Sequence, residues 1–377
     1  MNTHSSNNQL YYLDSLRGIA AICVVISHCF LWFLPGMHTG LSPEGSISNL
    51  VFNSPFTFFY KGGSAVLLFF VLSGYVLSFC CISKNLDSGY IQKSAAKRYL
   101  RLGIPVAGSI VISYFLVLSN TLIIDTLDLN NISNFQLFYT ALKSAIFGAM
   151  LYGDGTFNYV LWTISVEYYG SLLVFGFLLL VGNDLYKIRY LSAFIGIALM
   201  VNENPMLINY GLFFVGVFLS TFEIRKNNKL SSNVAAISIL CLGLYFLGYR
   251  AESESYFTLA KVLGAFQYTF NFPIQWPTFI PAVGSILILS TILINDSLLS
   301  LLNNRLFLLI GKLSFSIYLL HALILSIVAP KIALLEISNG SKALYSFTIT
   351  LFLTLIFSFI YYRHVDKRTI RYLKRIY

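Results

Sequence analysis

Arg17 and His28 are the first residues in the chain that could bind an anion and move a proton inside an apolar segment. They stand eleven positions apart, about three turns of a helix, so they share one helical face and lie roughly 16 Å apart along its axis. Histidine is the usual general base near neutral pH. A structural interpretation is also open, in which Arg17 extends to the membrane surface and His28 forms an interhelical hydrogen bond. The spacing therefore indicates either acid–base chemistry or helix packing.

A carboxylate lies in the middle of another apolar segment, at Glu167 in the sequence WTISVEYY, which begins at Trp162. An ionised side chain within a membrane segment is costly and requires a partner. A histidine or an arginine on another helix would serve. Glu167 is therefore a candidate either for catalysis or for a structural ion pair.

Arg98 and Arg101 follow a basic stretch and are spaced to lie on one helical face. The planar guanidinium fork matches the oxygens of phosphate groups, which favours a phosphate-binding role. Arginines at this position also anchor a helix end at the cytoplasmic membrane surface, and this explanation serves equally well.

A late apolar segment contains the polar sequence SFSIYLLH, residues 314–321. Ser314, Tyr318 and His321 are separated by four and three positions, so they share a helical face. His321 is the second histidine deep in an apolar segment, and it could hold the role of base instead of His28.

The elements that must position these side chains are membrane helices. Of 377 residues, 57% are hydrophobic and 11% are charged, whereas soluble domains carry about 25% charged residues. The mean hydropathy is +0.74, and apolar runs of about 20 residues, long enough to span a bilayer, recur along the chain. These features exclude a soluble globule, a disordered chain and a coiled coil, and they disfavour a β-barrel, whose strands alternate in hydrophobicity. The prediction is an all-α, polytopic integral membrane protein.

We expect about ten transmembrane helices in a single bundle, with residues 1–377 forming one domain and no appended soluble domain. The expected spans are 13–34, 56–82, 102–118, 159–181, 190–201, 206–222, 234–249, 279–294, 306–329 and 344–362. Two more apolar stretches, 135–151 and 256–272, become external or re-entrant helices on this count, and counting both as spans gives twelve.

The distribution of charge predicts the orientation. The net charge of +10 arises from Lys and Arg in alternate loops and in the C-terminal tail, a pattern typical of membrane topology rather than of nucleic-acid binding. Both termini are therefore expected in the cytoplasm. The segment 119–134, which carries Asp125 and Asp128 but no basic residue, is expected outside. The five cysteines lie in apolar runs and show no disulfide or metal-ligand spacing.

Five motifs span nearly the entire chain. They are LDSLRGIAAICVVISH (13–28), FFVLSGYVLS (69–78), KRYLR (97–101), WTISVEYYGSLLVF (162–175) and SFSIYLLH (314–321). In this order they resemble the motifs of the bacterial acyltransferase-3 family, the membrane O-acyltransferases that include O-antigen acetylases. The sequence departs from the family at Tyr168, where a second acidic residue often follows Glu167, and at 365–368, where the closing proline is absent.

The resemblance implies transfer of an acyl group, usually acetyl from acetyl-CoA, to a hydroxyl of a cell-surface polysaccharide or lipid-linked glycan such as the O-antigen of lipopolysaccharide. His28 would be the general base, and Glu167 would orient or polarise it. A covalent acyl-enzyme through a serine or a histidine stays open as an alternative to direct transfer. Arg98, Arg101 and Arg17 would hold the phosphates of CoA at the cytoplasmic face. No permanently bound cofactor and no metal is expected, since acyl-CoA is a substrate. The other expected donor-binding or substrate-binding residues are Ser73, Trp162, Tyr318 and His321.

Two other classes of function fit a polytopic helical protein. A secondary transporter or flippase for a glycan or an organic anion would also contain buried charges, but transporters often have inverted repeats with interrupted helices, and we detect none. A purely structural subunit leaves His28, Glu167 and His321 without a role in costly positions. The sequence thus predicts a multi-pass acyltransferase of the bacterial inner membrane, whose partners are acyl-CoA, a glycan acceptor and the bilayer, and not nucleic acid.

Overall fold

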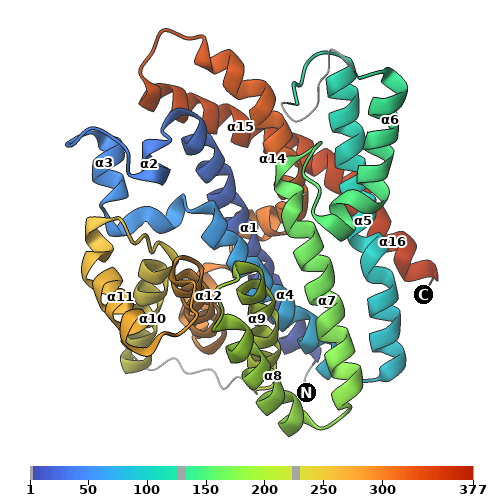
Figure 1. Ribbon diagram of the computed structural model, residues 1–377. Helices are drawn as coiled ribbons and strands as arrows, with labels where there is room; N and C mark the ends of the chain where they lie inside the picture. The colour runs from blue at the N-terminus through green and yellow to red at the C-terminus, as the bar shows by residue number, and fades with distance from the viewer. Residues whose placement is uncertain (1–2, 125–131, 223–229, 377) are drawn as a thin grey trace.

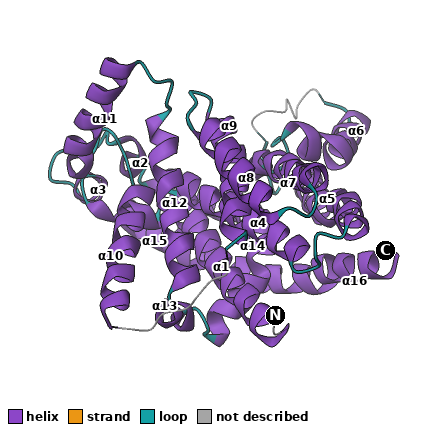
Figure 2. Cartoon of the chain, turned by 90° about the horizontal axis from the view of Figure 1, so that it is seen from below, coloured by secondary structure: helices purple, strands orange, loops and turns teal. Residues whose placement is uncertain are grey.

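The computed structural model describes residues 3–124, 132–222 and 230–376, and the regular structure in these ranges is entirely helical (Figures 1 and 2). The prediction of an all-α fold is confirmed. The α-helices are α1 (Thr3–Phe33), α2 (Gly36–Thr39), α3 (Ile47–Phe52), α4 (Gly62–Ile82), α5 (Ser88–Leu118), α6 (Asn134–Lys143), α7 (Trp162–Val181), α8 (Leu185–Met200), α9 (Pro205–Ser220), α10 (Leu230–Leu247), α11 (Phe257–Phe270), α12 (Trp276–Ile294), α13 (Asp296–Leu301), α14 (Arg305–Ala333), α15 (Asn339–Tyr361) and α16 (Lys367–Ile376). Short 3-10 or π segments are η1 (Pro55–Phe59), η2 (Ser144–Tyr152), η3 (Tyr159–Leu161), η4 (Glu254–Tyr256) and η5 (Tyr362–Asp366).

Each of the ten expected spans corresponds to a helix, but the helices differ in length. In the described ranges, seven are long and apolar enough to cross a membrane, namely α1, α4, α5, α7, α12, α14 and α15 with its C-terminal extension. The other three are shorter: α8 and α9 have 16 residues each, and the apolar part of α10 is Asn233–Leu247. The molecule is therefore a helical membrane protein, and the count of ten spans is not confirmed.

Helix α5 begins much earlier than the expected span at 102. Asp87 caps its N-terminus, with a side-chain oxygen accepting the amide of Tyr90 at 2.6 Å. The basic stretch that includes Arg98 and Arg101 is consequently part of the helix, and the two arginines lie three positions apart on it, as their spacing predicts. The earlier start of α5 matters because the same regular helix that packs against α7 carries both arginines.

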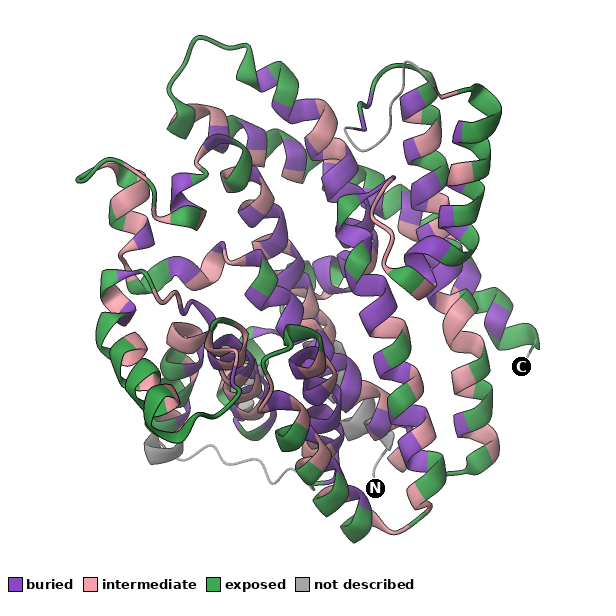
Figure 3. Cartoon of the chain, viewed as in Figure 1, coloured by how far each residue is buried: buried purple, intermediate pink, exposed green. Residues whose placement is uncertain are grey.

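Helices α1, α4 and α14 form the centre of the bundle. Helix α1 packs against α4, α14 and α15, and α4 packs against α7, α9 and α12, as Figure 2 shows from the end of the bundle. Figure 3 shows buried residues concentrated on these central helices, whereas the outer helices expose much of their surface. That exposed surface is rich in large apolar side chains, as expected of lipid-facing helices. Examples with more than half of the side chain exposed are Phe115, Leu180, Phe194 and Phe352.

A glycine contact fixes how α1 and α14 approach each other. A Cβ atom added at Gly18 would lie 2.7 Å from the backbone nitrogen of Gly311, so neither position has room for a side chain. Small residues of this kind allow membrane helices to pack closely. His28 and His321 each lie ten positions beyond the contact, 28 − 18 on α1 and 321 − 311 on α14. The two helices run side by side and bring the two histidines to the same level.

The two additional apolar stretches both form helices. The first corresponds to α6 and η2, and η2 packs against α5 and α7. The second corresponds to α11, which has no buried residue. The acidic residues Asp125 and Asp128 of the expected external segment lie outside the described residues, so the orientation in the membrane stays a prediction.

Candidate active site

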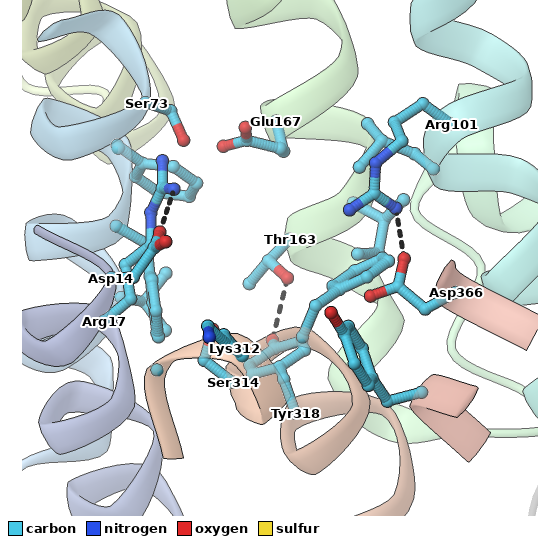
Figure 4. A pocket seen from close by; sticks show the side chains of 18 of the residues that line it. Asp14, Arg17, Ser73, Arg101, Thr163, Glu167, Lys312, Ser314, Tyr318 and Asp366 are labelled. Atoms are coloured by element: carbon cyan, nitrogen blue, oxygen red, sulfur yellow. Dashed lines mark hydrogen bonds and ion pairs between the residues drawn. The ribbon is translucent and has the colours of Figure 1, made fainter. Parts of the chain in front are cut away.

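A cavity of about 320 Å³ lies between α1, α4, α5, α7 and α14, with η5 and α16 along one side. Its size is typical of small-molecule sites. Figure 4 shows most of its polar side chains pointing toward a common space from different helices. The lining residues with polar side chains are Asp14, Arg17, Ser73, Arg98, Arg101, Thr163, Glu167, Lys312, Ser314, Tyr318, Tyr362 and Asp366.

The Arg98–Glu167 ion pair joins α5 to α7 at the wall of the cavity. Both side chains are only 16% exposed, and the Nε–H of Arg98 also donates to the Ser171 hydroxyl at 2.8 Å. Figure 4 shows the Ser73 hydroxyl and the Glu167 carboxylate directed toward each other. Glu167 was expected to orient His28. In the described structure its charged partner is Arg98 instead, because a buried carboxylate is best stabilised by a guanidinium that donates to it directly.

Two further arginines at the cavity also have carboxylate partners. Arg101 forms an ion pair with Asp366 of η5, and Arg17 lies 3.5 Å from Asp14 on its own helix. Lys312 adds a fourth cation, and its side chain is exposed. Three carboxylates, those of Asp14, Glu167 and Asp366, face four cations, those of Arg17, Arg98, Arg101 and Lys312. The surplus positive charge suits an anionic ligand such as a phosphate.

His28 and His321 form a hydrogen-bonded pair. Nδ1 of His28 lies 3.0 Å from Nε2 of His321, and the planes of the two rings differ by only 3°. His321 is fully buried, whereas His28 is partly exposed. The ring of Tyr159 packs edge-on against His28, with centroids 5.2 Å apart. Of the two imidazoles, His28 is thus the one that a substrate can reach.

Tyr318 lies between the cavity and the histidine pair. It lines the cavity, and its ring centroid is 5.8 Å from that of His321. Its hydroxyl is 2.7 Å from the Thr163 hydroxyl and donates to the carbonyl of Val160 at 2.7 Å. Tyr318, hydrogen-bonded to Thr163, therefore lies between the cationic cavity and the histidine pair.

The structure gathers most of the predicted site residues, but not all in one place. Arg17, Ser73, Arg98, Arg101, Glu167 and Tyr318 line the cavity, while His28 and His321 form the adjacent pair. Trp162 is 42% exposed and is not among the lining residues, although its neighbour Thr163 is.

The sequence interpretation missed several residues of the site. Lys312 stands two positions before Ser314, the first residue of the SFSIYLLH motif, and a charge at the start of this apolar segment was the available signal. Asp14 lies three positions before Arg17, a spacing that places the two side chains on one helical face, whereas no sequence pattern paired Asp366 with Arg101. Within the described ranges, no group of three or more His, Cys, Asp and Glu is arranged to hold a metal ion.

Comparison with known proteins gives two matches. Residues 10–363 match the family model of the acyltransferase-3 family, described as an acyltransferase domain. The chain is 23% identical over 431 aligned positions to the O-acetyltransferase PaAT-1 of Phomopsis amygdali, in an alignment that covers 97% of this chain and 84% of that protein. No solved structure matches. Because the family model extends over nearly the whole chain, as the five motifs predicted, the protein belongs to the acyltransferase-3 family and is a membrane acyltransferase.

Proposed function

We propose that this protein is an O-acyltransferase that moves an acetyl group from acetyl-CoA to a hydroxyl of a cell-surface polysaccharide or a lipid-linked glycan such as O-antigen. The observation that carries the proposal is the position of a partly exposed, hydrogen-bonded histidine next to a cavity with surplus positive charge. The name of the relative, an O-acetyltransferase, supports the acetyl donor and the oxygen acceptor.

The cavity provides the donor site in this proposal. Arg101 and Lys312 are the more accessible cations, and with Arg17 they would bind the phosphates of CoA through charge-assisted hydrogen bonds. Arg98 is more deeply buried and already bound to Glu167 and Ser171, so its part is to hold α5 against α7. The thioester end of the donor would extend toward Tyr318.

The chemistry requires one base and no permanently bound group. His28 takes the proton of the acceptor hydroxyl while that oxygen attacks the carbonyl carbon of the thioester. The carbon–sulfur bond then breaks, and the CoA thiolate leaves and takes the proton back from His28. The products are an O-acetyl ester and the free thiol of CoA, so both atoms and charge balance.

The proposed orientation of the protein in the membrane places the cavity on the side where acetyl-CoA is available, the cytoplasm. We place the cavity at the cytoplasmic side of a bacterial inner membrane, with both termini cytoplasmic. This arrangement agrees with the basic residues that flank the cavity on α5 and on α16, since positive residues favour the cytoplasmic side. The acceptor would then approach His28 from the opposite side of the Tyr318–Thr163 layer.

The proposal is tested with purified protein in lipid nanodiscs. Release of the CoA thiol is measured with acetyl-CoA and with surface polysaccharide from a strain that lacks the gene, and mass spectrometry of the polysaccharide detects the acetyl ester. His28→Ala should lower turnover by about 10²–10⁴-fold, the usual contribution of a general base. The exposed His364 is the matched control, and His364→Ala should retain activity. No thiol release above that of empty nanodiscs, or equal turnover in His28→Ala, contradicts the proposal.

A further inference from the structure

The buried histidine of the pair has a second hydrogen bond that fixes its protonation. Nδ1 of His321 lies 3.0 Å from the backbone carbonyl oxygen of Ile317, one turn earlier on α14. A carbonyl oxygen only accepts hydrogen bonds, so Nδ1 of His321 must carry the hydrogen. In the neutral imidazole the other nitrogen, Nε2, then has a lone pair and can only accept.

The tautomer of His321 in turn determines the tautomer of His28. The nitrogen that faces the lone pair of His321 is Nδ1 of His28, at 3.0 Å, and for a hydrogen bond to exist it must carry the hydrogen. The nearly parallel ring planes fit an in-plane N–H···N hydrogen bond. Nε2 of His28 is consequently left unprotonated, with its lone pair free.

We propose that His321 is a positioning residue for the acyl transfer described above, and that the chain Ile317 carbonyl, His321, His28 makes Nε2 of His28 the atom that takes the acceptor's proton. When His28 becomes an imidazolium, its Nδ1–H donates to His321 as a charge-assisted hydrogen bond, which stabilises the cation. An aspartate performs the same orienting task in serine hydrolases. Here a neutral imidazole performs it, anchored to a helix backbone. The catalytic role of Nε2 of His28 rests on the proposed function, whereas the assigned tautomers of His28 and His321 do not.

A third histidine provides an internal contrast. Nε2 of His38 lies 3.1 Å from the carbonyl oxygen of Ser27, so by the same reasoning His38 carries its hydrogen on Nε2. The structure therefore assigns Nδ1–H to His28 and His321 and the opposite tautomer to His38. The contrast can be measured without any substrate.

The kinetic test asks whether His321 acts by accepting a hydrogen bond from His28 or only by filling space between the helices. His321→Leu removes the acceptor and should lower kcat by about 10–100-fold, the range found when a metal-bound histidine loses the partner that orients it, while the KM for acetyl-CoA stays near that of the wild type. His321→Gln places an amide oxygen where it can accept from Nδ1 of His28, and it should restore most of kcat. A glutamine variant as inactive as the leucine variant, combined with an active His28→Gln enzyme, would give the base role to His321 and overturn the proposal.

The spectroscopic test is independent of activity. Nitrogen-15 NMR of histidine-labelled protein in lipid bilayers distinguishes Nδ1–H from Nε2–H, and single substitutions of the five histidines assign the signals. We expect Nδ1–H at His28 and His321 and Nε2–H at His38, with the His28 signal altered in His321→Leu. An Nε2–H signal at His28 would refute the proposal even in an active acyltransferase. The expected tautomers in a protein that transfers no acyl group would instead disprove the function alone.

Discussion

Two groups of cations lie on either side of the histidine pair, and they are stabilised in different ways. Around the cavity, Arg17, Arg98 and Arg101 each have a carboxylate partner. Near the C-terminal end of α1, Lys61 and Arg250 donate to backbone carbonyls instead. We call His38, Lys61 and Arg250 the far cluster.

The contacts of the far cluster join distant segments of the chain. Lys61 donates to the carbonyl of Tyr249, and Arg250 donates to the carbonyl of His38 at 2.6 Å. The guanidinium of Arg250 also lies 5.6 Å from the Phe52 ring centroid and 5.5 Å from that of Tyr60, within cation–π range. These contacts tie the α2–η1 region to the segment that follows α10.

The different partners of the cavity arginines and of the far cluster indicate different roles for the two groups of charges. A carboxylate partner keeps a guanidinium charged beside a cavity, and a ligand phosphate can take over part of that partnership. A neutral backbone carbonyl compensates less than a carboxylate does for the free-energy cost of burying a cation. Burial lowers the pKa of Lys61 to about 7, with repulsion from Arg250 acting in the same direction and Glu252 opposing it. On the proposed function the cavity is organised to bind an anion, whereas the contacts of the far cluster hold distant segments of the fold together.

The largest expected effect is on stability, when the buried pair at the cavity is broken. Glu167→Ala leaves Arg98 buried without its carboxylate, and removal of one partner of a buried ion pair typically costs about 3–5 kcal/mol. Arg250→Met leaves only neutral carbonyl and ring partners, and should cost about 1–3 kcal/mol. Thermal unfolding in one detergent compares the two variants.

A double variant provides the control for this comparison. Arg98→Met combined with Glu167→Leu removes both charges together and should recover most of the stability lost in Glu167→Ala. Its acyltransferase activity should stay low, because the wall of the cavity has changed. Equal unfolding temperatures for Glu167→Ala and the wild type would show that this ion pair contributes nothing to the fold.

The sequence could predict the helices and six of the polar residues that line the cavity because both depend on local patterns. Long apolar runs specify membrane helices without reference to the rest of the chain. Arg98 and Arg101 are three positions apart on one helix, so their common direction is visible in the sequence. Glu167 was recognised because a carboxylate inside an apolar segment is unusual.

The partners of these residues could not be predicted, since they depend on how helices are rotated against each other. His28 and His321 are 293 positions apart, and their contact follows from the close approach at Gly18 and Gly311. The pairing of Arg101 with Asp366 joins residues 265 positions apart. With no such information, a carboxylate partner for His28 was the reasonable expectation, and an imidazole occupies that place instead.

The second expected effect is on donor affinity. Arg101→Ala and Lys312→Ala should each weaken acetyl-CoA binding by about tenfold or more, because a charge-assisted hydrogen bond contributes about 1.5–3 kcal/mol. Asp366→Asn removes the carboxylate that competes with the donor's phosphates for Arg101, so the affinity for acetyl-CoA should stay equal or rise. Lys61→Met, in the far cluster, should not change it. Isothermal titration calorimetry measures all four, and loss of affinity in Asp366→Asn with none in Arg101→Ala would reverse the assignment.

The third expected effect is on the pH dependence of stability, and it is tested at Lys61 and His38 of the far cluster. In the unfolded chain Lys61 titrates near its ordinary pKa of 10.5, whereas in the folded protein its pKa is about 7. Between these values the unfolded chain binds a proton that the folded protein has released, so the free energy of unfolding rises with pH. Lys61→Met removes that difference and should flatten the rise between pH 7 and about 9, below the range in which tyrosines titrate.

His38 gives the matching result at lower pH. Burial, followed by the charge of Arg250, lowers its pKa from 6.5 to about 4, against the opposing effect of its hydrogen bond to Ser27. Stability should therefore fall as pH decreases from 6.5 to 4, because the unfolded chain gains a proton that the folded protein resists. His38→Gln should flatten this lower limb and leave the upper one intact, while Lys61→Met should do the reverse. Unfolding temperatures measured across both ranges separate the two groups. If neither substitution changes the slope in its own range, the far cluster is more hydrated than its packing indicates, and the contrast with the cavity loses its electrostatic basis.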